Sequence, residues 1–83
     1  MQLLYFAWLR TKIGVGAEEL DLPTEVTNVE QLLEWLSQRG PGYADALVDH
    51  SVVRVAVNQE YVGLDHTLSA NDEVALFPPV TGG

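Results

Sequence analysis

One strongly amphipathic helix limits what this chain can fold into. Between residues 29 and 36 the apolar residues recur at intervals of three and four, the spacing of a single stripe along a helix. They are Val29, Leu32, Leu33 and Leu36. Thr27 and Glu30 form the pattern of a capping box, which bonds the first free N–H groups of a helix. The sequence therefore predicts a helix that starts near Thr27 and ends near Arg39 and Gly40, with one face to bury.

Four apolar runs around this helix are typical of strands. They are residues 2–8, 19–22, 53–57 and 73–77. In the third run Val53, Val55 and Val57 alternate with other residues, which predicts a half-buried strand. Gly14 and Gly16 interrupt the apolar pattern and predict a loop between the first two strands. Residues 41–48 are expected to form a second short helix, because proline suits a first helical turn.

The order strand, strand, helix, strand, strand predicts a two-layer α+β domain. Its 83 residues leave room for one hydrophobic core. We therefore expect one domain over residues 1–78, followed by an extended tail over residues 79–83. Because a single helical layer covers one face of the sheet, the other face is expected to lie against solvent or a partner.

Composition excludes several classes of function. The chain has no cysteine, so disulfides, iron–sulfur clusters, thiolate zinc sites and a cysteine nucleophile are ruled out. Its formal charge of −8 argues against nucleic-acid and membrane partners, and fits either a basic protein partner or simple solubility. No apolar run approaches the roughly 20 residues of a membrane span, and no signal-peptide pattern opens the chain. A cytoplasmic location is expected.

Residues able to do chemistry by themselves are scarce. Asp49, His50 and Ser51 are adjacent, so their side chains point in different directions and cannot form a relay. His50 and His66 are the only histidines, too few for a zinc site without further ligands. We therefore predict no metal site and no enzyme that acts alone.

The tail is the most informative segment. Pro78 and Pro79 hold the exit from the last strand extended, and Gly82 and Gly83 carry no side chains. Five extended residues reach about 17 Å, enough to enter the active site of another protein. A terminal carboxylate presented in this way suits activation as an acyl-adenylate and attack by a nucleophile.

Taken together, these features resemble the ubiquitin-like β-grasp sulfur carriers, and among them the small subunits of molybdopterin synthases. The resemblance rests on Val57-Asn58-Gln59, Asp65-His66 and the segment DEVALFPPVTGG at residues 72–83. It extends over nearly the whole chain and is strongest toward the C-terminus. It implies a ubiquitin-like β-grasp fold, with a mixed sheet of four to five strands packed on one main helix.

The resemblance also implies a function in molybdenum cofactor biosynthesis. A ubiquitin-activating-like adenylyltransferase would use ATP to adenylate the Gly83 carboxylate, and a sulfur donor such as a cysteine desulfurase system would convert it to a thiocarboxylate. Pro79, Val80, Thr81 and Gly82 would thread into the active site of the synthase large subunit, where the sulfur passes to cyclic pyranopterin monophosphate. The chain would bind no cofactor itself, would not be an enzyme alone, and would join a heterotetramer.

The family's pattern places Phe6, Tyr61 and Phe77 at the contact with the large subunit. Alternation supports Phe77, because Val74 and Leu76 are expected to face the core and leave Phe77 on the uncovered face. Each could instead be an edge residue under a loop. Other functions also remain open: a sulfur carrier for thiamine or tRNA thiolation, a ubiquitin-like modifier joined to lysines, or an interaction domain.

Overall fold

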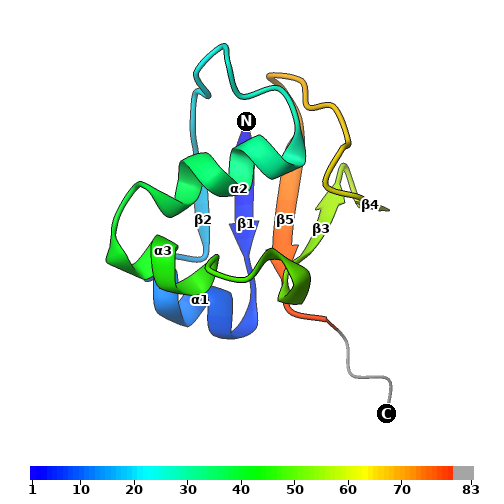
Figure 1. Cartoon of the computed structure of the whole chain (residues 1–83). Coiled ribbons are helices and arrows are strands. Elements are labelled where there is room, and N and C mark those ends of the chain that lie inside the picture. Colours follow the sequence, from blue (N-terminus) through cyan, green and yellow to red (C-terminus); the bar gives the residue numbers. More distant parts are fainter. Residues whose placement is uncertain (80–83) are drawn as a thin grey trace.

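The chain folds as a mixed five-stranded sheet with helices on one face, which confirms the predicted α+β class (Figure 1). The computed structural model describes residues 1–79. In chain order the elements are β1 (Gln2–Tyr5), α1 (Ala7–Ile13), β2 (Ala17–Glu19), α2 (Val29–Ser37), α3 (Pro41–Ala46), the 3-10 helix η1 (His50–Val52), β3 (Arg54–Val57), β4 (Glu60–Val62) and β5 (Glu73–Phe77). The strand order is β2-β1-β5-β3-β4, with β1 and β5 parallel and the other pairs antiparallel.

Helix α2 supplies the centre of the core, as its apolar stripe predicts. Its inward residues are fully buried together with residues of the sheet, including Leu3, Val74 and Leu76. Those on α2 are Val29, Leu32, Leu33 and Leu36. Val53, Val55 and Val57 also lie in the core, as alternation predicts.

The ends of α2 differ from the prediction. The cap is Asn28, whose side-chain oxygen accepts from the Gln31 N–H at 2.9 Å. The Gln31 side-chain oxygen accepts from the backbone N–H of Thr27 at 2.7 Å. The capping pattern is thus shifted by one residue, because an asparagine oxygen caps as well as a threonine hydroxyl. At the other end Gln38 is the cap, and Gly40 instead precedes α3.

The first strand ends at Tyr5, three residues before the predicted end, and α1 follows it. Phe6 is the extended residue before α1, and Gly14 ends the helix in a left-handed conformation with φ of 98°. The Gly14 N–H donates to the Arg10 carbonyl at 2.8 Å. The loop predicted at Gly14 and Gly16 is confirmed between α1 and β2, whereas the helix that precedes it was not predicted. An apolar run such as residues 2–8 fits either structure by periodicity, which is why the prediction failed here.

The two edge strands were the hardest to predict. β2 occupies Ala17–Glu19 instead of residues 19–22, and pairs with β1 so that Glu18 lies opposite Leu3. β4 was not assigned to any residues by the sequence. It is three residues long and joins β3 through Asn58 and Gln59, both with positive φ. That is a hairpin turn without the glycine that usually identifies it.

α3 is two residues shorter than predicted and packs closely on α1. A Cβ atom on Gly42 would overlap the carbonyl oxygen of Lys12, so a residue without a side chain is required there. The Lys12 ammonium also pairs with the Asp45 carboxylate at 2.5 Å. The two helices thus pack on each other beside α2, on the same face of the sheet (Figure 1). Within residues 1–79, no helix has the length and apolar character to cross a membrane.

Candidate functional site

The exit of the C-terminal tail lies at the end of the central strand. β5 covers Glu73–Phe77, as predicted, and Pro78 and Pro79 follow it. Because β1 and β5 are parallel, the exit lies at the end of the sheet opposite the N-terminus (Figure 1). The predicted tail residues Val80, Thr81, Gly82 and Gly83 lie outside the described residues, so the boundary between domain and tail stays a prediction.

Tyr61 and Phe77 meet beside this exit. Their ring centroids are 5.5 Å apart with an interplanar angle of 45°. Tyr61 lies opposite Ala56, whose small side chain leaves the tyrosine ring uncovered, and it is 79% exposed. The rings border a groove of ≈ 420 Å³, whose lining is completed by three residues of β3 and β4: Arg54, Val55 and Val62. An apolar groove with an exposed aromatic rim can receive a side chain of a partner protein.

Phe6 lies near this exit but apart from the aromatic pair. Its N–H donates to the Leu76 carbonyl at 3.1 Å, which places its backbone beside the end of β5. Its side chain is 48% exposed. Within residues 1–79 the aromatic contacts are Tyr61–Phe77 and Tyr5–Tyr43, so the Phe6 ring does not stack on the pair. The structure thus brings together two of the three predicted interface residues and places the third nearby.

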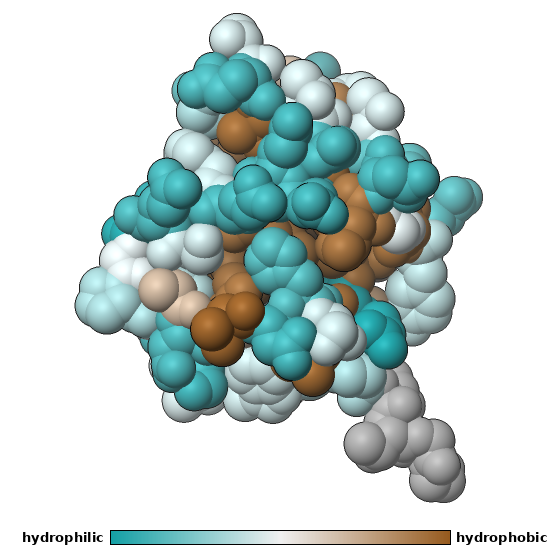
Figure 2. Space-filling model, viewed as in Figure 1, coloured by the Kyte–Doolittle hydropathy of each residue, from teal (hydrophilic) through white to brown (hydrophobic). Residues whose placement is uncertain are grey.

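The surface on the face that carries α2 is mainly hydrophilic, with apolar residues visible between hydrophilic ones (Figure 2).

The adjacent residues Asp49, His50 and Ser51 do not form a catalytic relay, as the sequence predicts. The Asp49 carboxylate accepts from the backbone N–H and the hydroxyl of Ser51, at 3.0 and 2.6 Å. These bonds lower the Asp49 pKa and cap η1, and His50 takes no part in them. Within residues 1–79 no group of three acidic or histidine residues could hold a metal ion.

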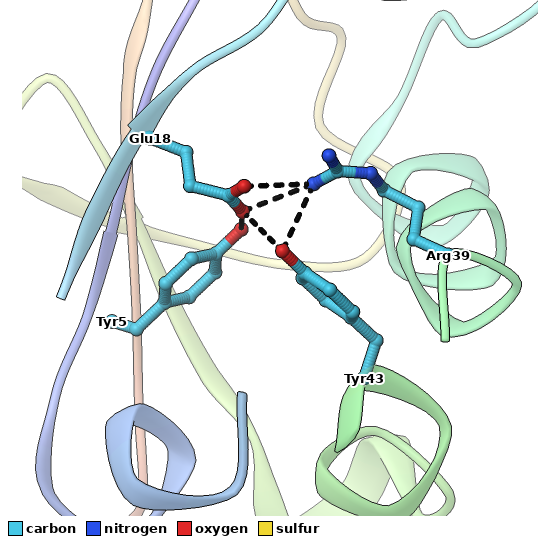
Figure 3. Close-up of polar contacts among 4 residues, drawn as sticks. All are labelled: Tyr5, Glu18, Arg39 and Tyr43. Atoms are coloured by element: carbon cyan, nitrogen blue, oxygen red, sulfur yellow. Dashed lines mark hydrogen bonds and ion pairs between the residues drawn. The ribbon is translucent and has the colours of Figure 1, made fainter. Parts of the chain in front are cut away.

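A polar cluster that sequence reasoning missed ties α3 and the connection before it to β1 and β2 (Figure 3). The Glu18 carboxylate accepts from the hydroxyls of Tyr5 and Tyr43, at 2.7 and 2.8 Å. Arg39 Nη1 donates to both Glu18 oxygens, at 3.1 and 3.0 Å. The Arg39 guanidinium also lies 4.9 Å from the Tyr43 ring centroid. No sequence signal joins these residues, because β1, β2, α3 and the connection between α2 and α3 that carries Arg39 meet only in the fold.

This cluster shifts the acid–base behaviour of its members. Burial disfavours the charged form of Glu18, but the hydrogen bonds from Tyr5, Tyr43 and Arg39 outweigh it and lower the Glu18 pKa. Burial, followed by the Glu18 hydrogen bond, raises the pKa of Tyr5. The cluster therefore holds one carboxylate ionised beside neutral tyrosines, which is a structural arrangement and not an acid–base pair for catalysis.

We expect Glu18 to make folding stability depend on pH. Because its folded pKa lies below the ordinary value of 4.5, its contribution is present above that pH and is lost as pH falls through the folded pKa. Glu18→Gln should lower the free energy of unfolding by about 1–2 kcal/mol at pH 7 and weaken the loss of stability in acid. Urea unfolding, repeated from pH 7 downward through the folded pKa of Glu18, measures the free energy of unfolding and its dependence on pH. Glu25→Gln, on the exposed surface, is the control. An unchanged acid profile would contradict the assignment.

The mixed sheet, the helix packed across it and the tail that leaves from its central strand define the ubiquitin-like β-grasp class. Residues 3–83 match the model of the ThiS family, and the chain belongs to that family. It is 42% identical to the molybdopterin synthase sulfur carrier subunit of Escherichia coli, over 100% of this chain and 99% of the relative. These matches confirm the predicted resemblance.

Solved structures show the same fold. A Pyrococcus furiosus protein named molybdopterin converting factor, subunit 1, superposes with a TM-score of 0.77 at 34% identity, over 95% of each chain. Small archaeal modifier protein 1 from Haloferax volcanii gives a TM-score of 0.73 at 29% identity, over 100% of this chain and 98% of that one. Subunit 1 in the Helicobacter pylori complex of molybdopterin-converting factor subunits 1 and 2 gives 0.65 at 22% identity, over 99% and 96%.

Proposed function

We propose that this chain is the sulfur carrier subunit of a molybdopterin synthase, and that Gly83 carries the sulfur. The observation that carries the proposal is the 42% identity to the Escherichia coli carrier over 100% of this chain and 99% of the relative. The chain then works in molybdenum cofactor biosynthesis as a donor of sulfur. It is not an enzyme on its own, since the chemistry of activation and transfer belongs to its partners.

The reaction begins at the terminal carboxylate. A ubiquitin-activating-like adenylyltransferase joins the Gly83 carboxylate to AMP from ATP and releases pyrophosphate. Sulfide attacks the carbonyl carbon, expels AMP and leaves a thiocarboxylate directly. Where the donor is the persulfide of a cysteine desulfurase system, its attack expels AMP and forms an acyl disulfide, and a thiol of the donor then cleaves the S–S bond, which releases the thiocarboxylate and leaves the donor as a disulfide. Because the chain has no cysteine, no thiol of its own competes for the activated carbonyl. The chain itself holds no cofactor in this proposal, and ATP is used by the activating enzyme.

The large subunit of the synthase is the proposed partner of the tail exit. Pro79, Val80, Thr81 and Gly82 thread into its active site, where the sulfur passes to cyclic pyranopterin monophosphate. Phe6, Tyr61 and Phe77 form the contact around the base of the tail, which is supported by the exposure of Phe6 and Tyr61, by the ring contact of Tyr61 with Phe77 of β5, and by the bond from the Phe6 N–H to Leu76. The Helicobacter pylori protein of the same fold stands in a complex with subunit 2. A cytoplasmic location, and the absence of nucleic-acid and membrane partners, stay predictions from composition.

Mass spectrometry of the C-terminal peptide tests the carrier chemistry. After incubation with ATP, the adenylyltransferase and a sulfide source, we expect the peptide that ends at Gly83 to gain the mass of one oxygen-to-sulfur exchange. The peptide, not the intact chain, is measured, because oxidation of Met1 would imitate that shift. A sample without ATP is the control. If the Gly83 carboxylate stays unchanged in the presence of a competent activating enzyme, the proposal is wrong.

A second candidate function is a protein modifier joined to lysines, supported by the likeness to the Haloferax volcanii modifier. A carrier for thiamine or tRNA thiolation is the third. Isopeptide-linked conjugates that contain Gly83 would favour the modifier. Sulfur transfer to cyclic pyranopterin monophosphate by the large subunit would separate the molybdopterin pathway from the other thiolation pathways.

A further inference from the structure

Arg54 lies at the rim of the groove beside the tail exit. It is the first residue of β3 and pairs in register with Phe77, the last residue of β5. Its side chain is exposed and lines the groove of ≈ 420 Å³ together with Tyr61 and Phe77. It also lines a neighbouring hollow of ≈ 210 Å³ that extends to η1. A positive charge therefore lies directly beside the apolar surface next to which the tail extends from β5.

The rest of the molecule's charge makes this position unusual. The chain has four lysines and arginines against twelve carboxylates. The ion pairs within residues 1–79 are Lys12–Asp45 and Arg39–Glu18, and neither includes Arg54. The fourth cation, Arg10, lies against Gly16 near β2, at the other edge of the sheet. Arg54 is thus the cation that this groove presents.

The guanidinium of Arg54 retains donors for a partner. One nitrogen, Nη1, donates to the Ser51 carbonyl at 3.0 Å, which positions the side chain over the start of β3. A guanidinium carries five N–H donors in a planar fork, and this fork matches a carboxylate with two parallel bonds. Apolar rings beside the charge exclude water from such a pair once a partner covers them, which strengthens it.

We propose that Arg54 pairs with a carboxylate of the molybdopterin synthase large subunit, next to an apolar side chain that fills the groove between Tyr61 and Phe77. This inference rests on the proposed function, since it names the contact made at the same tail exit. The apolar anchor supplies affinity, and the charge pair fixes how the carrier is rotated on its partner. That rotation decides whether the tail points into the active site.

Titration of the carrier against the cognate large subunit tests the charge pair. We expect Arg54→Gln to raise the Kd about tenfold and Arg54→Glu to raise it further, while Arg54→Lys keeps most of the affinity. Lys12→Gln removes the same charge from the α1–α3 surface and is the matched control, expected to stay within about twofold. Because salt screens a covered ion pair only weakly, the difference between wild type and Arg54→Gln should largely persist when the ionic strength is raised to about 0.5 M.

The outcomes separate this inference from the function on which it rests. Thermal unfolding of each variant first establishes that the fold is intact. If Arg54→Gln binds as tightly as wild type, or if Lys12→Gln weakens binding equally, the Arg54 contact is overturned while the carrier function stands. If wild-type carrier does not bind the large subunit at all, both are overturned. A selective loss at Arg54 that persists at high ionic strength supports the proposal, and a loss that disappears there contradicts a covered ion pair.

Discussion

Deletion of Gly82 and Gly83 is expected to abolish molybdopterin formation and leave the unfolding of the domain unchanged. The deletion shortens the extended tail by about 7 Å, so the carboxylate no longer reaches the same point in a partner. It also moves the carboxylate to Thr81, whose branched side chain does not fit a channel shaped for glycine. We expect a loss of at least about a thousandfold in a reconstituted assay, because misplacement of a reacting group by even about 1 Å can cost a hundredfold.

The control for this deletion keeps the length of the tail and its final glycines. Thr81→Ala retains both and should preserve most of the activity. Urea unfolding of the truncated chain should match wild type, because Leu76 of β5 is the last core residue within residues 1–79. If the truncated chain supports product formation at the wild-type rate, Gly83 does not carry the sulfur. This holds whatever effect the deletion has on binding.

The parts of the fold that could be predicted are those whose signal is local. The stripe on α2 and the alternation in β5 each arise within one short segment, and both elements appear with the predicted buried residues. The tail composition predicts an extended terminus with a reactive carboxylate for a similar reason, and this stays a prediction. Proline and glycine restrict or free the backbone wherever they occur, so their effect does not depend on distant contacts.

The parts that could not be predicted depend on contacts between distant segments. Glu18 lies in a short polar edge strand, and what fixes its place is a set of bonds to Tyr5, Arg39 and Tyr43. The partners are 13, 21 and 25 positions away, so no periodic pattern records them. Helix α1 was missed because its apolar residues continue those of β1 without a break.

The candidate site shows the same division. Alternation along β5 predicted that Phe77 would face away from the core, and its flanking residues Val74 and Leu76 are indeed fully buried. The ring contact with Tyr61 depends on the register of β3 with both β4 and β5, which the sequence does not specify. Arg54 gave no signal of its own, because a lone arginine in a strand is common and its meaning comes from its neighbours.

We expect Phe77→Ala to weaken binding of the large subunit about 30-fold or more, the largest effect of any single substitution at the tail exit. Phe77 and Tyr61 border the groove that receives the partner's apolar side chain, and aromatic hot spots of an interface cost about 2 kcal/mol or more when truncated. The predicted tail begins two residues after Phe77, so we expect loss of the ring also to make the orientation of the tail on the partner less defined. Titration measures the change in Kd, and thermal unfolding checks that β5 is intact.

A substitution at an exposed apolar residue outside the groove separates this effect from a general loss of apolar surface. Val48 is 81% exposed between α3 and η1, so Val48→Ala should change the Kd by less than about twofold. Tyr61→Ala removes the other half of the aromatic pair. If the pair acts as one unit, the double variant should lose less affinity than the two single losses predict together. If Phe77→Ala binds as tightly as wild type, the groove is not the docking surface. The contact proposed for Arg54 is then contradicted as well.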